Sequence, residues 1–254
     1  MQLFSSNFKL GILGGGQLGK MLMYDAKRYD LHTKVMDSNQ EAPCAKLADE
    51  FIIGDITDYD DVVSFGNKVD IITVEIEKIN TDALLFLEKK GKKVFPSART
   101  LKVIQNKSDQ KDFYKQHNLP SSRFKNYSNL DELINNFEND NFEFPFVWKS
   151  SRFGYDGKGV KIIKNYDDLN FSFENECMIE EKISIHKELS VIVARNISGE
   201  MKCFSVVEME FNENSNLVEY VICPANISND IEKKAMQIAM NTSEKFNMVG
   251  LLAV

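Results

Sequence analysis

A glycine-rich segment near the start of the chain has the first spacing with chemical meaning. Gly14-Gly15-Gly16-Gln17-Leu18-Gly19 fits G-x-G-x-x-G, follows a short apolar run and precedes residues with helical spacing. Glycines let backbone amides approach a phosphate at a helix N-terminus, where the helix dipole favours negative charge. Asp37 lies about 20 residues further on, where a nicotinamide-dependent enzyme has its ribose-binding acid. This pattern leaves two interpretations open, a phosphate or nucleotide contact and a purely structural tight turn.

A second glycine-rich segment follows a predicted strand that ends at Lys149. It consists of Gly154, Tyr155, Asp156, Gly157, Lys158, Gly159 and Val160. A glycine-rich hairpin with nearby lysines is suited to cover a triphosphate, because amides and ammonium groups neutralise its charge. The segment joins strand to strand and lacks G-K-[ST], so it is not a Walker A loop. A hairpin tip without a ligand is the alternative, and Lys149 favours nucleotide cover.

Charged residues also gather at the end of a later predicted strand. That strand ends with Glu180, Glu181, Lys182 and Ile183, and Glu188 opens the next strand. A strand edge can bind the rim of an adenine base through free N–H and C=O groups, and a carboxylate can bind both ribose hydroxyls. Without the second glycine segment, exposed surface charges would be the more common interpretation.

The elements that position these residues begin with alternating strands and helices. Five short strands are predicted at Lys9–Leu13, Lys34–Asp37, Glu50–Ile53, Asp70–Val74 and Val94–Phe95, and a helical pattern follows the first, third and fourth of them. Such alternation predicts an open parallel sheet with helices on both faces. We expect this α/β, Rossmann-like domain to span residues 1–96.

From residue 97 the pattern changes to α+β, which predicts a second domain over 97–254. Ser97–His117 is expected to be mainly helical, Leu130–Phe137 to be a short helix and Asn135–Asn141 to be a polar loop. A long helix is predicted from Ser228 to Phe246, before a final apolar strand over Val249–Val254. The expected strands between them are Phe146–Lys149, Val160–Ile163, Cys177–Glu181, Glu188–Arg195, Met201–Glu208 and Leu217–Cys223.

The composition and charge of the chain argue against several classes of function. The chain has 254 residues and a formal net charge of −7, which gives no electrostatic footprint for nucleic acid or an anionic membrane. No apolar run approaches the roughly 18 residues of a membrane span. The cysteines form no C-x-x-C pair and are expected to be buried free thiols of a cytoplasmic protein: Cys44, Cys177, Cys203 and Cys223.

Six segments together resemble the 5-(carboxyamino)imidazole ribonucleotide synthase family, ATP-grasp enzymes of purine biosynthesis. In chain order they are LGILGGGQLGKML at Leu10–Leu22, TVEIEKI at Thr73–Ile79, QNKSDQKDF at Gln105–Phe113, GYDGKGV at Gly154–Val160, VVEME at Val206–Glu210 and VGLLAV at Val249–Val254. The resemblance spans the whole chain. It implies a Rossmann-like parallel sheet followed by an ATP-grasp α+β domain with a lid subdomain over about residues 120–185.

The resemblance also implies a reaction. ATP phosphorylates bicarbonate, and the exocyclic amine of 5-aminoimidazole ribonucleotide captures the activated carboxyl group. The products are the N5-carboxylated ribonucleotide, ADP and phosphate, in a reaction that depends on positioning and charge neutralisation. ATP and Mg2+ are the implied cofactors, and a homodimer is the implied assembly.

Site residues follow from the resemblance by position. Lys107 and Lys149 should bind ATP phosphates, and Gly154–Val160 should cover them. Gln105-Asn106-Lys107 stands where the family has Q-D-R, and lysine keeps the charge but loses the bidentate fork of arginine. The other implied contacts are Glu180, Glu181, Lys182 and Ile183 with adenine, Glu188 with the ribose, Glu208 near the nucleotide, and Gln17, Leu18 and Glu75 with the ribonucleotide.

No catalytic side chain and no metal ligand is assigned within the chain. The family continues past a segment like Val249–Val254 with carboxylates that bind magnesium, so metal ligands are expected beyond Val254. The ATP-grasp domain is therefore expected to be incomplete at its C-terminus and not to turn over alone. Two alternatives stay open, a NAD-dependent dehydrogenase and the non-catalytic nucleotide-binding half of a split protein.

Overall fold

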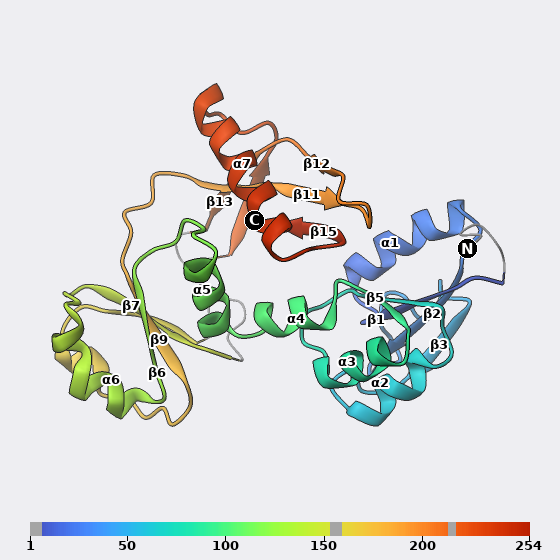
Figure 1. The fold of residues 1–254 in the computed structure, drawn as a ribbon, viewed down its shortest axis with the longest axis horizontal. Helices are drawn as coiled ribbons and strands as arrows, with labels where there is room; N and C mark the ends of the chain where they lie inside the picture. Colours follow the sequence, from blue (N-terminus) through green and yellow to red (C-terminus); the bar gives the residue numbers. More distant parts are fainter. Residues whose placement is uncertain (1–6, 153–158, 213–216) are drawn as a thin grey trace. The chain divides into compact units, whose positions relative to one another are not determined.

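The computed structural model describes residues 7–152, 159–212 and 217–254 (Figure 1). The chain divides into two compact units, and each is considered by itself. The first unit comprises Met1–Lys102 with Met248–Gly250, and the second comprises Val103–Asn247 with Leu251–Val254.

The first unit is built on the predicted parallel sheet. Its strands are β1 (Lys9–Leu13), β2 (His32–Asp37), β3 (Glu50–Ile53), β4 (Ile71–Val74) and β5 (Lys93–Phe95). They pair in parallel in the order β3-β2-β1-β4-β5, which confirms the predicted α/β fold of this region. The order reverses between β1 and β4, and ligands of such sheets bind beyond the carboxyl ends of the strands at this point.

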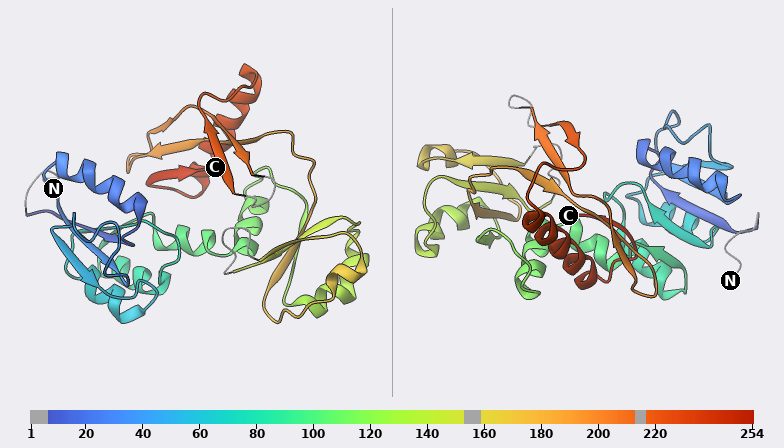
Figure 2. Two further views of the ribbon diagram at one scale, coloured as in Figure 1. Left: turned by 180° about the vertical axis from the view of Figure 1, so that it is seen from behind. Right: turned by 90° about the horizontal axis from the view of Figure 1, so that it is seen from above.

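Helices cover both faces of this sheet (Figures 1 and 2). Helix α1 (Gln17–Arg28) buries Met23 against Ile12. Helices α2 (Tyr59–Gly66) and α3 (Thr81–Lys89) pack in the cluster that contains Leu13. Ile12 and Leu13 are successive residues of one strand, so their side chains point to opposite faces and serve two separate cores.

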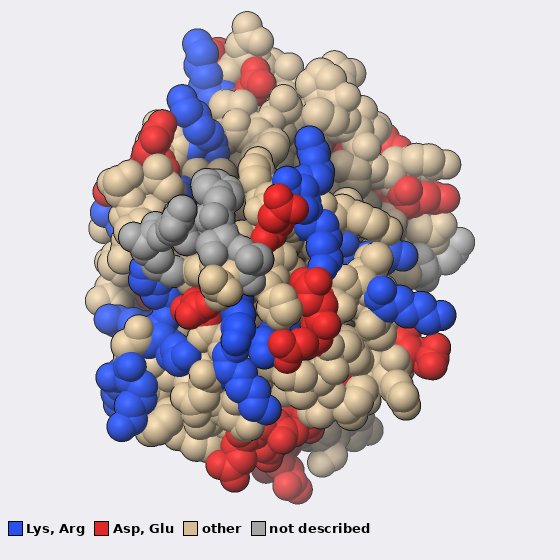
Figure 3. Space-filling model, turned by 90° about the vertical axis from the view of Figure 1, so that its right-hand side faces the viewer, with Lys and Arg blue, Asp and Glu red and all other residues tan. Residues whose placement is uncertain are grey.

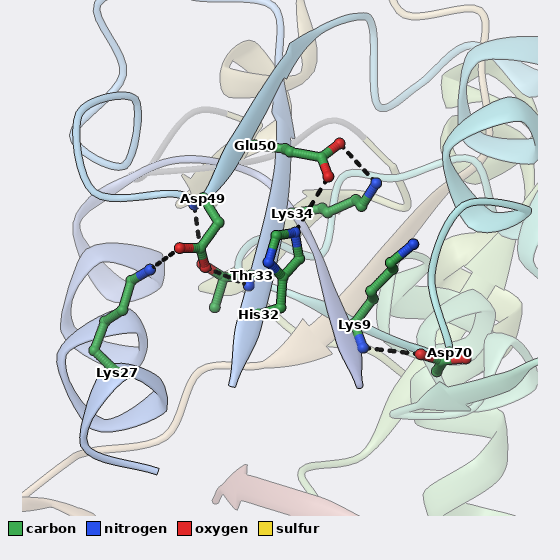
Figure 4. Close-up of polar contacts among 8 residues, drawn as sticks. All are labelled: Lys9, Lys27, His32, Thr33, Lys34, Asp49, Glu50 and Asp70. Carbon is green, nitrogen blue, oxygen red and sulfur yellow. Dashed lines mark hydrogen bonds and ion pairs between the residues drawn. The ribbon is translucent and has the colours of Figure 1, made fainter. Parts of the chain in front are cut away.

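Charged side chains join the amino ends of neighbouring strands in this unit (Figure 4). The Asp49 carboxylate accepts hydrogen bonds from the backbone and hydroxyl of Thr33, at 2.7 and 2.9 Å, and pairs with Lys27. The ammonium of Lys34, a residue that is 6% exposed, lies 2.6 Å from Glu50 Oε2. These contacts lie at the end of the sheet opposite the glycine loop, because that loop follows the carboxyl end of β1.

Two helices rather than one follow the parallel sheet in the chain. Helix α4 (Ala98–Ile104) and helix α5 (Lys107–Gln116) replace the single helical segment expected over Ser97–His117. Asn106 interrupts the helical pattern because its Oδ1 caps the second helix, accepting from the amides of Ser108 and Asp109.

A four-stranded antiparallel sheet follows. Strands β6 (Phe124–Tyr127), β7 (Phe146–Ser150), β8 (Val160–Ile163) and β9 (Cys177–Glu181) pair in the order β6-β9-β7-β8. The sequence pattern missed β6. The loop expected over Asn135–Asn141 is mostly helical, because α6 (Leu130–Asn136) and η1 (Phe137–Asp140) occupy it; a second short 3-10 helix is η2 (Tyr166–Leu169).

Two long strands predicted after residue 187 are wrong, because each divides between two sheets. The predicted strand Glu188–Arg195 becomes β10 (Glu188–Ser190) and β11 (Ile192–Arg195), separated at the buried Val191. The predicted strand Met201–Glu208 becomes β12 (Met201–Cys203) and β13 (Val207–Phe211). The resulting sheets have the orders β10-β13-β14 and β12-β11-β15, with β14 over Val218–Ile222 and β15 over Gly250–Ala253.

Helix α7 (Asn229–Lys245) packs on this region. Its Ala239 is fully buried in a cluster with Val191, Val193 and Val206. The helix begins after Ser228, whose hydroxyl accepts from the amide of Ile231, so the helix predicted from Ser228 to Phe246 is confirmed to within one residue at each end.

The cysteines differ in exposure. Cys44 and Cys177 are buried, as expected, and burial is the main reason that the pKa of each thiol rises to about 11. Cys203 is half-buried and Cys223 is exposed, so the expectation of four buried thiols is wrong for these two. The exposure of Cys223 follows from its place directly after β14, in which every residue is exposed.

Charged side chains of both signs lie on one face of the molecule (Figure 3). Basic and acidic side chains lie beside one another on the face shown in Figure 3. No helix among the described residues is long and apolar enough to cross a membrane.

Candidate nucleotide site and glycine loop

Strand β7 places Lys149 on the face of the four-stranded sheet that lies opposite the aromatic core. Its residues alternate between buried and half-buried, and Phe146 and Trp148 point into an aromatic core. A strand has a side-chain period of two, so Val147 and Lys149 point to the opposite face. The sequence alternation therefore presents the Lys149 ammonium away from the core.

Glu180 joins this face from β9. Val147 is paired with Glu180 and Lys149 with Met178, so the side chains of Lys149 and Glu180 are diagonal neighbours. The Lys149 ammonium forms an ion pair with Glu180 Oε1, and the Lys111 ammonium lies 2.7 Å from Oε2. Burial alone would raise the pKa of Glu180, but the hydrogen bonds and charges of the two lysines outweigh it and hold the pKa below its usual value.

Helix α5 brings Lys107 and Lys111 to the same site. The two residues are four positions apart and therefore share a face of the helix. The start of the helix is tied to the end of β7, because the Lys107 amide donates to the carbonyl of Ser151 at 2.8 Å. The hydroxyls of Ser108 and Ser151 lie 2.6 Å apart in a buried contact.

Lys107 and Lys149 form a pair of cations. Burial and the charge of Lys149 lower the pKa of the Lys107 ammonium. Two like charges held close together are mutually unfavourable, so an anion that contacts both would be stabilised. The arrangement suits a phosphate group.

The second glycine segment is described only at its end. Gly159 has a positive φ of 76°, and its carbonyl accepts from the Ser150 amide at 2.8 Å. Val160 begins β8 opposite Lys149. Five predicted cover residues lie outside the described residues: Gly154, Tyr155, Asp156, Gly157 and Lys158.

The predicted adenine-contacting segment follows the same strand. Glu181 makes backbone and side-chain hydrogen bonds to the backbone of Arg123, at 3.0 and 3.1 Å. Successive residues of a strand alternate, so Glu181 points away from the face that carries Glu180. Lys182 and Ile183 are exposed beyond the end of β9.

The structure does not bring Glu188 and Glu208 together. Glu188 is paired with Met209 and Leu189 with Glu208, so the two glutamates lie on opposite faces of the β10–β13 pair. The Glu208 carboxylate lies 2.8 Å from the Lys187 ammonium and accepts from the Asn226 amide. The hydrogen bond from Lys187 is the main reason that the pKa of Glu208 is lowered.

The first glycine loop is closed by a carboxylate of its own unit. Asp37 Oδ2 accepts from the Gly15 amide at 2.7 Å, and Oδ1 accepts from the Asn39 amide at 2.8 Å. The dehydrogenase alternative required Asp37 for a cofactor ribose and the loop amides for a pyrophosphate. Asp37 binds the loop instead, which argues against that alternative.

Glu75 lies against the same loop. Its amide donates to the Leu13 carbonyl at 2.8 Å, which holds it at the carboxyl end of β4 beside β1. A Cβ atom on Gly16 would lie 2.6 Å from Glu75 Oε1, and one on Gly14 would lie 2.9 Å from Oε2. The carboxylate thus occupies the space that the glycines leave, and it is suited to accept from hydroxyl groups.

Gln17 and Leu18 are the first residues of α1, directly after this loop. Both are exposed, Leu18 by 66% of its surface. Gly16 is the N-cap and offers no side chain to the first amides of the helix. The first amides of α1 therefore have no side-chain cap.

Sequence reasoning missed three contributors to these sites. Lys111 and Ser122 both contact Glu180, and Lys187 contacts Glu208. Spacing could have revealed Lys111, because it follows Lys107 by one helical turn. The contacts of Ser122 and Lys187 depend on strand pairing and have no local signal.

Potential metal ligands do not cluster in the described parts of the chain. No group of three or more His, Cys, Asp or Glu side chains is placed there so that it could hold a metal ion. Glu180 and Glu208 are each paired with lysine.

Comparison with known proteins identifies the two regions. Residues 8–105 match the ribonucleotide synthetase preATP-grasp domain, and residues 112–254 match the ATP-grasp domain. The N5-carboxyaminoimidazole ribonucleotide synthase of Bacillus subtilis is 32% identical over 96% of this chain and 64% of its own length. Phosphoribosylaminoimidazole carboxylase of Candida albicans is 32% identical over 96% of this chain and 44% of its own length.

Solved structures agree in fold. The N5-carboxyaminoimidazole ribonucleotide synthetase of Thermotoga maritima has a TM-score of 0.85 and 36% identity, over 97% of this chain and 63% of that one. The Aspergillus clavatus synthase, solved with ADP and 5-aminoimidazole ribonucleotide, has a TM-score of 0.84 and 26% identity, over 98% and 66%. The chain thus spans less than two thirds of the length of these proteins. The resemblance expected from the motifs is confirmed, and the chain belongs to the ATP-grasp family.

Proposed function

We propose that the chain provides the nucleotide site and the ribonucleotide site of an N5-carboxyaminoimidazole ribonucleotide synthase. The reaction is the ATP-dependent carboxylation of 5-aminoimidazole ribonucleotide with bicarbonate, with release of ADP and phosphate. The main supporting observation is that the ammonium group of Lys107, at the start of α5, feels the charge of Lys149 on β7, the strand that precedes the second glycine-rich segment in the chain. Relatives with this activity in their names match nearly the whole chain.

In this proposal the lysine pair neutralises the phosphates of ATP. The Lys149 ammonium exchanges Glu180 for a phosphate oxygen, and Lys107 binds from the start of α5. Fixed positive charge stabilises the transferring phosphoryl group as it moves to bicarbonate, because phosphoryl transfer depends mainly on positioning and electrostatics. Gly154–Val160 covers the phosphates, Glu180–Ile183 contacts adenine and Glu188 binds the ribose, while Glu208 stays a predicted neighbour of the nucleotide.

The ribonucleotide occupies the carboxyl end of the parallel sheet. Glu75 accepts hydrogen bonds from ribose hydroxyls, and the exposed start of α1 at Gln17 and Leu18 contributes backbone amides. The Aspergillus clavatus synthase binds 5-aminoimidazole ribonucleotide and ADP in its solved complex, which supports the same pair of ligands here.

Magnesium belongs to the predicted reaction, but the described residues do not fit a magnesium site. The ion prefers several oxygen ligands, and the described carboxylates nearest the nucleotide site are neutralised by lysine. We derive no step through the ion, and ligands beyond Val254 stay a prediction. A homodimer, a cytoplasmic location and the domain limits of 1–96, 97–254 and a lid over about 120–185 also stay predictions.

Because the chain is not expected to turn over alone, the test is ADP formation from ATP by a version of the protein that continues past Val254, with 5-aminoimidazole ribonucleotide and bicarbonate added separately and together. We expect ADP formation only when both are present. ADP binding by that version without such turnover would contradict the carboxylase reaction and favour the nucleotide-binding half of a split protein. Binding of NADH in place of ADP would contradict the proposal as a whole.

A further inference from the structure

We propose that Lys111 is a positioning residue, which holds Glu180 in place while Lys149 leaves it for a nucleotide phosphate. The inference rests on the proposed function, because it assumes that a phosphate is the second partner of Lys149. Lys111 itself does not touch the nucleotide in this proposal. Its role is to keep the buried carboxylate paired in both states of the site.

The first observation is the set of hydrogen-bond partners of the Lys111 ammonium. It lies 2.7 Å from Glu180 Oε2, 2.8 Å from Ser121 Oγ and 2.7 Å from Ser122 Oγ. A lysine ammonium has three donors, so all of them are used here. Only 15% of the side chain is exposed. Lys111 is thus fixed within the protein and has no donor left for a ligand.

The second observation is that the two lysines use different oxygens of Glu180. Lys149 pairs with Oε1, whereas Lys111 and the Ser122 hydroxyl bind Oε2, the latter at 2.9 Å. Lys149 can therefore depart without disturbing the contacts of Oε2. Its side chain is also more exposed than that of Lys111, at 27% against 15%.

The cost of an unpaired buried carboxylate connects these observations. Glu180 is 9% exposed, and a buried charge that loses its partner is strongly destabilising. With Lys111 present, Glu180 stays paired after Lys149 moves to the phosphate. Without Lys111, the movement of Lys149 would leave the carboxylate with no cation, so Glu180 would compete with the phosphate for Lys149.

The experiment compares ADP with adenosine, because only ADP requires Lys149 to change partners. We expect Lys111→Met to weaken ADP binding about tenfold, the effect of losing one charged hydrogen bond, and to change adenosine binding less than twofold. Calorimetric titration measures both affinities. Lys115→Met is the matched control, because Lys115 is exposed on the same helix one turn later, and we expect it to change neither affinity.

A double-variant cycle tests whether Lys111 acts through Glu180. In a Glu180→Gln background the carboxylate charge is absent, so adding Lys111→Met should change ADP affinity less than twofold. Ser122→Ala is a milder second variant in case Lys111→Met does not fold, and we expect it to weaken ADP binding about threefold while leaving adenosine binding unchanged.

The outcomes separate this inference from the proposed function. If the unmodified chain binds ADP and Lys111→Met leaves ADP affinity unchanged, the positioning role is wrong and the proposed function stands. An equal loss of ADP and adenosine binding would indicate a merely structural lysine and would also overturn the inference. If the unmodified chain does not bind ADP, the proposed function is wrong, and so is the inference about Lys111.

Discussion

The strands that precede the two glycine-rich segments, β1 and β7, end beside different charges. The first segment lies between the carboxylates of Asp37 and Glu75, whereas the second follows Lys149, on the sheet face that also carries Glu180. Glycine permits close approach of the backbone to a ligand, but it does not by itself select the ligand. We therefore infer that the neighbouring charges select the ligand. Carboxylates suit ribose hydroxyls, and paired ammonium groups suit phosphates.

Each set of charges arises from the topology of its own sheet. In the parallel sheet, the carboxyl ends of β2 and β4 flank that of β1, so Asp37 and Glu75 reach one loop from both sides. In the antiparallel sheet, diagonal pairing joins Lys149 to Glu180. The contrast leads to four predictions.

The largest expected effect is on the proposed phosphate site. Lys149→Ala should weaken ADP binding by about a hundredfold, because a charged contact to phosphate is lost from a partly buried site. The free energy of unfolding should fall by only about 1 kcal/mol, since Glu180 keeps its contact with Lys111. Calorimetry and urea denaturation measure the two quantities. We expect the variant to have the same melting temperature with and without ADP. If ADP raised the melting temperature of the variant as much as that of the unmodified chain, the phosphate-binding role of Lys149 would be contradicted.

The second prediction concerns the closure of the first loop. Asp37→Ala removes the acceptor of two backbone amides, Gly15 and Asn39, and should lower the free energy of unfolding by about 2 kcal/mol. Urea denaturation measures the change. Asp25→Ala is the control, because Asp25 forms an exposed pair with Arg28 in helix α1, and it should change stability by less than about 0.5 kcal/mol. Equal effects of the two variants would mean that Asp37 does not hold the loop.

The third prediction separates backbone strain from the contact with Glu75. Gly14 and Gly91 both have positive φ, at 95° and 85°, but only a Cβ on Gly14 would meet Glu75, at 2.9 Å. Alanine at either position should cost about 1–2 kcal/mol of strain. Gly14→Ala should cost about 1 kcal/mol more than Gly91→Ala, because the Glu75 carboxylate must move. If the two variants lost the same stability in thermal denaturation, the Glu75 carboxylate would not lie against Gly14.

The smallest effect is expected far from both ligand sites. Burial would raise the pKa of Asp49, but hydrogen bonds from Lys27 and Thr33 outweigh it and lower the pKa to about 2. The unfolded-state value is about 3.9, so the ionised carboxylate stabilises the fold above about pH 4, and this contribution is lost as the pH falls towards 2. Asp49→Asn should lower the free energy of unfolding by less than about 1 kcal/mol at pH 7. The difference between the variant and the unmodified chain should disappear near pH 2. A difference that persists at pH 2 would contradict this assignment.

Much of the fold was predictable because its signals are local. The apolar runs of β1 to β5, and Asn80 before α3, which caps it by accepting from the Ala83 amide, are read from neighbouring residues. The divided strands around Val191 and Val206 were not predictable, because nothing in their patterning says that the chain passes from one sheet to another. Strand β6 was missed for a related reason, since its pairing with β9 joins residues fifty or more positions apart.

The sequence by itself determined which chemistry was present: two glycine segments, the lysines at 107 and 149, and the acids at 37, 75 and 180. Their types and order also determined the family resemblance. Only the tertiary structure decided which charges meet. It placed Asp37 and Glu75 on the first glycine loop and Lys111 on Glu180, and it separated Glu188 from Glu208. The physical reason is that strand register and sheet order set these distances, and neither is encoded in the spacing of residues along the chain.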